Sequence, residues 1–470
     1  MEEGYWMAEE DQRTPWKTLA CVVTGVFMVI LDTTVVNVAF PTLQREFGAS
    51  LQSAQWIVSL YVLVLGIVTP VAGYLADRFG LKRMFILGLA LFTAGSIACG
   101  VAPSLGWLIA GRVLQGVGGG ITQPSGTALL YRAFPPSRIG RAFGVFGLAL
   151  LVAPALGPVL GGWLVDAGYW RWIFFLNVPV GIWGIVAGRQ WLQEWKRPET
   201  PPLDRVGLVL SSVGFGSLLY AAASARAEGL TSTAVVASLA VGVAALVALW
   251  VVEHRSASPL LDVRLLENPI FLAANIVGYV GVVGLFAAQF LLPLFLETIQ
   301  GLSPGAVGLV LLAQPLAAAV ASPLSGRLYD KIGPRALAVT GFFLLAVSTW
   351  GLMHLDAHTP VSTIRLLLIL RGLAFGMTIQ TTFTTALGSV PRDRVARASA
   401  FVSATRFSIQ AVSVAILSAL VGGATGTFTV HGFAMAYGVT LAFAVLACVL
   451  AFRLPGWPGA WGGRDGMVAR

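Results

Sequence analysis

Charge is scarce in this sequence. Asp, Glu, Lys and Arg make up only 11% of its 470 residues, against about 25% in an average soluble domain. Hydrophobic residues reach 57%, and they recur in runs of about 20, long enough for a helix to cross the bilayer core. This balance excludes a soluble multidomain protein. We therefore expect an all-α integral membrane protein.

Cysteine and histidine are also rare. Cys21, Cys99 and Cys448 all lie inside apolar runs, and their spacing matches neither a disulfide framework nor a metal site. The four histidines lie in loops or at the ends of runs. No phosphate-binding loop of the pattern G-x-x-x-x-G-K-[S/T] is present. We therefore expect no metal, no cofactor and no catalytic residue, and a membrane enzyme is the least favoured class.

Fourteen apolar runs follow one another along the chain. They lie near residues 17–39, 53–74, 84–102, 106–130, 141–165, 171–191, 206–224, 232–252, 269–296, 304–325, 336–354, 363–387, 397–422 and 431–453. An even number of spans places both termini on one side of the membrane. If that side is the cytoplasm, the Lys and Arg residues that fall outside are only Arg45, Arg171, Arg226 and Arg365. The net charge of +9 is thus explained by the Lys and Arg residues that orient the chain in a plasma (inner) membrane, and no nucleic-acid partner is needed to explain it.

The first six runs resemble the last six. The charged stretch GYLADRFGLKR at 73–83 follows the second run, and its echo GRLYDKIGPR at 326–335 follows the tenth. LIAGRVLQG at 108–116 and LLILRGLAFG at 367–376 form another matched pair. Two six-helix halves around a central substrate site are a common transporter plan. The sequence therefore predicts three parts: an N-terminal six-span half at 1–193, a cytoplasmic linker with two extra spans at 194–264, and a C-terminal six-span half at 265–470.

The stretch GYLADRFGLKR resembles the loop G-x-L-A-D-r-x-G-r-k/r of the major facilitator superfamily, with Leu81 as a departure. The resemblance covers nearly the whole chain and extends to the fourteen-span drug:proton antiporter branch, of the multidrug efflux type. It implies the major facilitator fold, and it implies that the charged stretches latch the cytoplasmic side. A solvated, positively charged loop is the simpler alternative. The expected gate residues are Gly73, Asp77, Arg78, Gly80, Lys82 and Arg83 in the first half, and Asp330 and Arg335 in the second.

The fifth run, LALLVAPALGPVLGGWL at 148–164, is similar to the antiporter signature G-x-x-x-G-P-x-x-G-G, with Ala153 in place of the first glycine. Small residues at every fourth position allow close helix packing, and prolines allow a bend. Stripes of small residues are common in membrane helices, but in this family the signature accompanies antiport and implies export. Its residues here are Pro154, Gly157, Pro158, Gly161 and Gly162.

Two of the charged residues within the runs lie in stretches that resemble family signatures, and the motif around Arg112 is the one that the resemblance assigns to proton coupling. Asp32, in LDTTVVNVAFP at 31–41, is the only acidic residue well inside any run, and Arg112 lies in GRVLQGVGGG at 111–120. A charge in hydrocarbon is costly and should face a partner or a wet cavity. We expect this pair to carry the proton. A fixed structural ion pair, or an Arg112 side chain that snorkels to the headgroups, is the alternative.

Other polar side chains within the runs are candidates for the substrate cavity. Arg406, in SATRFSIQ, resembles an arginine of the branch, and Arg371 resembles the second-half counterpart of Arg112. Aromatic rings and amides suit loosely specified amphipathic ligands, although each alone is more often explained by helix packing. The candidates are Asn37, Trp56, Tyr61, Gln115, Gln123, Asn275, Tyr279, Gln289, Gln314, Gln380, Arg406 and Gln410.

Taken together, the resemblance implies a proton-coupled exporter (antiporter) of amphipathic or hydrophobic small molecules that works by alternating access. We expect drug efflux and antibiotic resistance, driven by the proton gradient. The partners would be protons, a small amphipathic substrate and the lipid bilayer, and the chain would act as a monomer. The alternatives are a lipid or metabolite exporter, an uptake symporter, which the fifth-run signature disfavours, and a passive channel, which should lack the pair Asp32 and Arg112.

Overall fold

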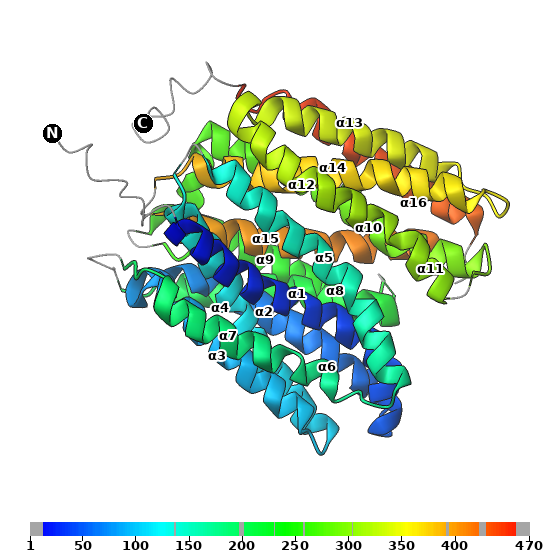
Figure 1. The fold of residues 1–470 in the computed structure, drawn as a ribbon, viewed down its shortest axis with the longest axis horizontal. Coiled ribbons are helices and arrows are strands. Elements are labelled where there is room, and N and C mark those ends of the chain that lie inside the picture. The colour runs from blue at the N-terminus through cyan, green and yellow to red at the C-terminus, as the bar shows by residue number, and fades with distance from the viewer. Residues whose placement is uncertain are drawn as a thin grey trace.

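The computed structural model describes residues 13–135, 138–196, 202–229, 231–256, 259–302, 304–391, 394–422 and 429–456. Every regular element in these ranges is a helix (Figure 1). The first seven helices are α1 (Arg13–Glu46), α2 (Leu51–Phe79), α3 (Leu81–Gly100), α4 (Leu105–Ala133), α5 (Ile139–Asp166), α6 (Trp172–Phe175) and α7 (Asn177–Trp191). Next come α8 (Arg205–Glu228), α9 (Thr233–Arg255) and the 3₁₀ helix η3 (Val263–Glu267). The last seven are α10 (Pro269–Thr298), α11 (Pro304–Leu311), α12 (Ala313–Ile332), α13 (Pro334–Met353), α14 (Val361–Gly388), α15 (Val395–Gly422) and α16 (Val430–Ala451).

Eleven helical stretches among the described residues are long and apolar enough to cross a membrane, and Pro269–Leu285 is a shorter apolar stretch. Hydrocarbon offers no water to bond the backbone, so continuous helices are the expected solution for a chain of this composition. The prediction of an all-helical membrane protein is thereby confirmed. The count of fourteen spans stays a prediction, because α4, α10 and α15 are not among the eleven.

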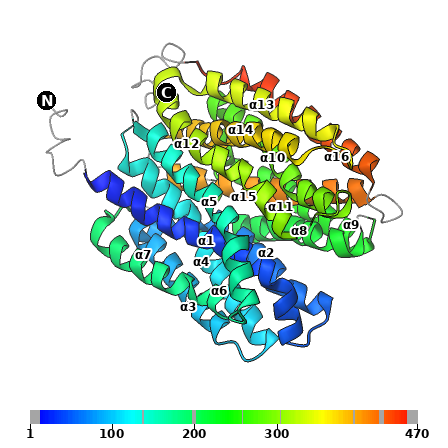
Figure 2. The same cartoon turned by 45° about the vertical axis from the view of Figure 1, so that its right-hand side comes forward.

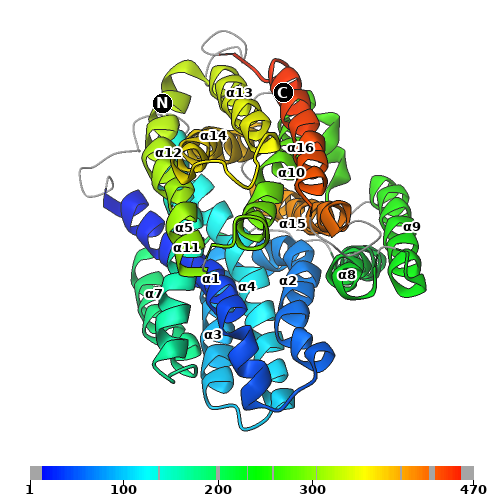
Figure 3. The ribbon, with the colours of Figure 1, turned by 90° about the vertical axis from the view of Figure 1, so that its right-hand side faces the viewer.

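The helices form two bundles and an outer pair. Helices α1–α7 make up the N-terminal bundle, and α10–α16 make up the C-terminal bundle (Figure 2). Helix α8 packs on α9, and it also lies against α2 and α15, one helix from each bundle. Figure 3 shows α8 and α9 at one edge of the molecule. The outer pair therefore touches both bundles from outside.

Two tight joints connect α2 to α3 and α12 to α13. Gly80 (φ 104°) and Gly333 (φ 79°) each separate the paired helices by a single residue. A positive φ is strained for a residue with a Cβ, so glycine is favoured at both joints. The same glycine occurs at the same place in the charged stretch and in its echo, and the joint explains why.

Helix α1 begins and α16 ends at the same end of the molecule, which we call the terminal face (Figure 1). At this face Arg335, at the start of α13, donates from Nε to the Leu454 carbonyl at 2.7 Å. The two bundles also meet here. A Cβ added to Gly140 at the start of α5 would lie 2.6 Å from the carbonyl oxygen of Gly326 in α12, so the two backbones are in close contact.

Candidate functional site

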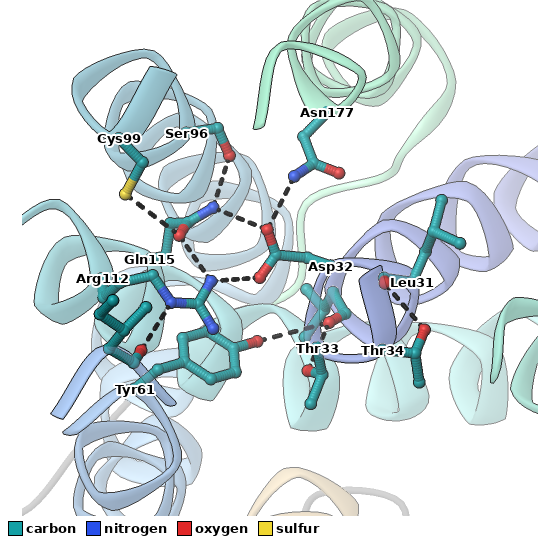
Figure 4. A network of polar contacts seen from close by, with 12 residues as sticks. Leu31, Asp32, Thr33, Thr34, Tyr61, Ser96, Cys99, Arg112, Gln115 and Asn177 are labelled. Atoms are coloured by element: carbon teal, nitrogen blue, oxygen red, sulfur yellow. Dashed lines mark hydrogen bonds and ion pairs between the residues drawn. The ribbon is translucent and has the colours of Figure 1, made fainter. Parts of the chain in front are cut away.

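Asp32 lies near the middle of α1 and is 1% exposed. Three side chains from other helices reach its carboxylate (Figure 4). Arg112 of α4 forms an ion pair with Oδ2, and Gln115 donates from Nε2 to Oδ1 at 3.0 Å. Asn177 of α7 donates from Nδ2 to the same Oδ1 at 2.9 Å. A buried carboxylate is tolerated when such donors replace water. One carboxylate therefore ties α1, α4 and α7 together.

Arg112 is 0% exposed, so its side chain does not reach the surface of the protein. Besides Asp32, it donates from Nε to the Ile57 carbonyl at 3.0 Å and from Nη1 to Gln115 Oε1 at 2.8 Å. The guanidinium carbon also lies 4.0 Å from the centroid of the Tyr61 ring, in a cation–π contact. The carboxylate, the amide, the carbonyl and the ring together compensate the buried positive charge.

Two residues of α3 orient Gln115. Ser96 Oγ accepts from Gln115 Nε2 at 2.7 Å, and the Cys99 thiol donates to Gln115 Oε1 at 3.5 Å (Figure 4). Ser96 and Cys99 are both fully buried. Because Gln115 bonds Asp32 and Arg112 at once, a change in charge at Asp32 alters the bonds of the whole network.

Asn177 and Ser96 were not among the site residues predicted from the sequence. Asn177 was detectable, because it is a lone amide inside the apolar stretch FFLNVPV of the sixth run. Ser96 carried no such signal, since small residues are common in membrane helices. Only the fold shows that Asn177 bonds Asp32 and that Ser96 bonds Gln115 in the same network.

Asp32 and Arg112 compensate each other's charge where both are excluded from water. Removing either charge would leave the other buried without its counter-ion, which is costly. The pair therefore links the packing of α1 to that of α4.

At the terminal face, Asp77 of α2 pairs with Arg397 of α15. Arg397 donates from Nε to Asp77 Oδ2 at 2.8 Å, and the two side chains are only 6% and 4% exposed. A Cβ added to Gly73 would lie 3.0 Å from Arg397 Cα, so Gly73 allows α2 and α15 to approach each other. This contact joins the two bundles. Arg397 was missed because it is 320 residues from Asp77 and no local pattern marks it.

Asp330 of α12 makes the corresponding contact from the other side. Its Oδ1 accepts from the backbone N–H of Gly140 at 3.1 Å, and its Oδ2 accepts from that of Arg141 at 3.2 Å. These N–H groups lie in the first turn of α5, so they have no partner within their own helix, and the helix dipole there also favours a negative charge. The end of α2 thus lies on the start of α15, and the end of α12 lies on the start of α5. We call these two contacts the gate.

Other charged residues of the two stretches bond within their own bundle. Lys82 donates from Nζ to the Arg189 carbonyl at 2.7 Å, and Arg83 lies 3.5 Å from Glu194 Oε2 with a largely exposed side chain. Arg78 donates to the Tyr74 hydroxyl, also in α2, at 3.5 Å. Three of the eight predicted gate residues contact the opposite bundle: Gly73, Asp77 and Asp330. Four bond within their own bundle: Arg78, Lys82, Arg83 and Arg335. The eighth, Gly80, forms the joint between α2 and α3.

The fifth-run signature packs α5 against α1. A Cβ added to Gly157 would lie 2.0 Å from Thr34 Oγ1, and one added to Gly161 would lie 3.1 Å from the Val35 carbonyl oxygen. Both contacts fall two or three residues after Asp32. Of the other signature residues, Pro154 is half-buried, Gly162 has no atom within 4 Å of an added Cβ, and the Pro158 side chain lies outside the described residues.

The predicted cavity residues do not share one location. Tyr61 and Gln115 belong to the Asp32 network, and Trp56 stacks on Tyr220 of α8 with 6.4 Å between ring centroids. Asn275 is 2% exposed and donates to a carbonyl of its own helix. The rest are Gln314 and Gln380, which are buried, Gln123 and Gln410, which are half-buried, Asn37, which is exposed, and Gln289, whose side chain lies outside the described residues.

Arg406 and Tyr279 lie close to the contact between the bundles. Arg406 is half-buried, donates to Thr382 Oγ1 at 2.8 Å and lies 5.1 Å from the centroid of Phe383. Phe383 in turn contacts Phe143 of the N-terminal bundle, with 6.0 Å between ring centroids. The Tyr279 hydroxyl bonds to the hydroxyl of Thr405, the neighbour of Arg406. These two candidates therefore lie where the bundles meet.

Arg371 is buried in α14 at 0% exposure. It donates from Nη1 to Thr349 Oγ1 at 3.0 Å and from Nη2 to the carbonyls of Gly284 and Leu285. The structure therefore gives this second buried arginine a hydroxyl and carbonyl groups as partners.

Comparisons with known proteins agree with this architecture. The family model described as Major Facilitator Superfamily matches residues 22–414 and, in a second match, 276–460. The multidrug resistance protein B homolog of Mycobacterium tuberculosis is 34% identical over 406 residues, which are 85% of this chain and 75% of that protein. The tetracenomycin C resistance and export protein of Streptomyces glaucescens is 32% identical over 380 residues, which are 81% of this chain and 71% of that protein.

A solved structure shows the same fold at low identity. The proton:xylose symporter XylE has a TM-score of 0.68 and 14% identity, covering 98% of this chain and 99% of that chain. The family match, the relatives and the helices long enough to cross a membrane identify a multi-pass membrane transporter, which is not an enzyme. The chain belongs to the Major Facilitator Superfamily, in its multidrug efflux branch.

Proposed function

We propose that this protein is a proton-coupled exporter, an antiporter, of amphipathic or hydrophobic small molecules. The observation that carries the proposal is the buried carboxylate of Asp32, paired with the fully buried Arg112 between α1 and α4. A buried carboxylate of this kind suits a proton carrier. Its negative charge is compensated by the cation Arg112, and a bound proton would compensate that charge instead. Two relatives, named for multidrug resistance and for tetracenomycin C export, support export as the direction.

We propose fourteen spans with both termini in the cytoplasm, and the three parts at 1–193, 194–264 and 265–470. Three long helices, α4, α10 and α15, would join the eleven apolar stretches, and the placement of Lys and Arg would make the terminal face cytoplasmic. The transporter would act as a monomer in the plasma (inner) membrane. It would need no cofactor, because the proton gradient supplies the free energy.

The transport cycle follows from the two networks. With the terminal face in the cytoplasm, the gate contacts at Asp77 and Asp330 close the cytoplasmic side in this conformation. Facing the acidic outside, Asp32 takes up a proton and the substrate leaves. The bundles then rock, the gate opens, the proton leaves to the cytoplasm and new substrate binds. Protons thus move inward as substrate moves outward.

The proton gradient is large enough for this exchange. One pH unit supplies about 1.4 kcal/mol per proton. A membrane potential of 100 mV adds about 2.3 kcal/mol for each charge moved. One proton could therefore sustain a concentration ratio of roughly a few hundredfold for a neutral substrate.

The test measures protons and compound together. Purified protein is placed in proteoliposomes with a trapped pH dye, a pH gradient is imposed, and tetracenomycin C and other lipophilic compounds are added singly. We expect the wild type to dissipate the gradient when a transported compound is present. Asp32→Asn, which keeps the size of the side chain, should lose this response. Asp166→Asn, at the exposed end of α5, is the matched carboxylate control and should keep it.

Each rival function gives a different result. An equal response in Asp32→Asn would contradict the role of Asp32 as proton carrier. Cells that overproduce the protein should accumulate less of a transported compound, and greater accumulation would identify the uptake symporter instead. Gradient dissipation by lipid species and not by drugs would identify the lipid exporter.

A further inference from the structure

The outer pair α8–α9 leads directly into the gate. After α9, the exit segment at 259–262 runs beside the start of α15. Its Pro259 carbonyl accepts from Arg397 Nη1 at 3.2 Å, while Nε of the same guanidinium holds Asp77. Asp262 in the same segment lies 3.3 Å from Arg394, which precedes α15. The arginine that closes the gate is therefore held by two elements, and one of them is the exit segment.

Glu253 fixes the exit segment. It lies in the last turn of α9 and is 0% exposed. Its Oε1 accepts from the backbone N–H groups of Leu260 at 3.1 Å and Leu261 at 3.2 Å. These residues directly follow Pro259, whose carbonyl binds Arg397. Two hydrogen bonds from adjacent backbone N–H groups to one buried side chain hold the segment in one position.

The first turn of α8 closes over this carboxylate. A Cβ added to Gly207 would lie 2.4 Å from Glu253 Oε1, so the α8 backbone is in contact with the Glu253 side chain. Ser256, just after α9, donates to Asp204 at the start of α8 at 3.2 Å. The two ends of the outer pair are thus bonded to each other beneath the exit segment.

We propose that Glu253 is a positioning residue of the gate, and that the outer pair orients Arg397 for its bond to Asp77. The exit segment continues into α10, so Pro259 and Arg397 both belong to the side of the gate formed by the C-terminal bundle. When α2 separates from α15, the Pro259 bond can persist and keep the guanidinium oriented for reclosing. This lowers the entropy cost of closure and favours the conformation closed at the terminal face. The inference concerns how the gate closes, and it does not depend on which substrate is carried.

The experiment measures the gate directly, without substrate. Spin labels are placed at Gln190 of α7 and Lys331 of α12, both exposed near the terminal face, with Cys448 replaced by Ser and the buried Cys21 and Cys99 kept. Distances between the two labels, measured by double electron–electron resonance, then give the ratio of protein with the gate closed to protein with the gate open. Glu253→Ala should lower this ratio about tenfold, the size expected for the loss of its two backbone hydrogen bonds. Glu253→Gln keeps an acceptor oxygen and should restore it to within about twofold of the wild type.

A double-mutant cycle separates positioning from general stability. In an Asp77→Asn background the gate ion pair is already absent, so Glu253→Ala should change the ratio by less than about twofold. An equal effect in both backgrounds would overturn the proposal, as would an unchanged ratio in Glu253→Ala. Glu267→Gln is the matched control, because Glu267 follows the exit segment, is 65% exposed at its side chain and, among the described residues, forms its ion pair only with His254.

Glu253→Asp serves if the alanine variant does not fold. It keeps the charge but is one methylene shorter and does not reach both N–H groups. The same pattern is expected: a lower ratio in the wild-type background and little change in the Asp77→Asn background. The proposal would be overturned if Glu253→Asp, whose side chain is too short to bond both Leu260 and Leu261, had the same ratio of closed to open protein as the wild type.

Discussion

Arg112 in α4 and Arg371 in α14 occupy matching places in the two halves of the sequence, and both are 0% exposed. Their surroundings differ. Arg112 pairs with the carboxylate of Asp32 and with Gln115 three residues along. At the position that corresponds to Gln115, the second half has Ala374, and Arg371 has no carboxylate partner among the described residues.

The two halves of the repeat thus share a buried arginine, but the groups that bond it differ. Arg112 is paired with a carboxylate, the group proposed above as the proton carrier. Arg371 is held by carbonyls and by the Thr349 hydroxyl, which do not titrate in the physiological range. We infer that the N-terminal bundle carries the proton response and that Arg371 holds α10, α13 and α14 together.

The largest expected effect separates the two arginines by function. Arg112→Gln should lower proton-driven exchange by about a hundredfold or more, because it strands the buried Asp32 carboxylate. Arg371→Gln should lower it by less than about threefold and keep the response to pH, since only neutral contacts are lost. The measurement is compound-dependent proton flux in proteoliposomes. Arg365→Gln, an exposed arginine on the same helix as Arg371, is the control. Equal losses for Arg112→Gln and Arg371→Gln would break the comparison.

The second prediction concerns stability. Arg112→Gln removes one member of a buried ion pair and should cost about 3–5 kcal/mol of unfolding free energy. Adding Asp32→Asn should recover a large part of that loss, because no unpaired charge then stays buried. Thermal unfolding in detergent measures both variants. If the two substitutions destabilise additively, the residues do not act as a pair.

The third prediction compares the two gate contacts. Asp77→Asn breaks a buried ion pair with Arg397 and should slow turnover about tenfold, with little change in apparent affinity. Asp330→Asn keeps one acceptor for the N–H groups of α5 and should slow turnover only about threefold. Initial transport rates over a range of substrate concentrations give both quantities. A loss of affinity with normal turnover would assign Asp77 to substrate binding instead.

The smallest expected effect compares one side chain near each buried arginine: Asn177, which bonds Asp32, and Tyr437, which interacts electrostatically with Arg371. Asn177→Ala removes a donor to Asp32 and should cost about 1–2 kcal/mol of stability. Tyr437→Phe should be neutral within about 0.5 kcal/mol, because the Tyr437 hydroxyl is buried with no hydrogen-bond partner among the described residues. The thermal unfolding midpoints of the two variants and the wild type measure these changes in stability. A destabilised Tyr437→Phe would show that the hydroxyl has a partner after all.

Rarity decided which site residues could be predicted. Asp32 stands out because it is the only acidic residue deep in an apolar run, and Arg112 because arginine is costly there. Their contact joins residues 80 positions apart. Arg397 and Glu253 lie at the ends of runs, where charged residues are common, so composition did not mark them as gate residues. The cavity list was long because amides and aromatics inside the runs look alike in sequence, and the structure distributes them over several places.

The sequence by itself determined that this chain is a helical membrane protein with an internal repeat, and it marked Asp32 and Arg112 as rare charges inside apolar runs. Apolar runs, glycine at the joints and the scarcity of charge are local properties, so they can be read in order along the chain. Only the tertiary structure decided the partners: Asn177 beside Asp32, Arg397 on Asp77, and an exit segment held by Glu253. These contacts join helices far apart in sequence. They depend on which faces of those helices pack together, because a buried charge is stable only where the fold brings a compensating group within hydrogen-bond distance.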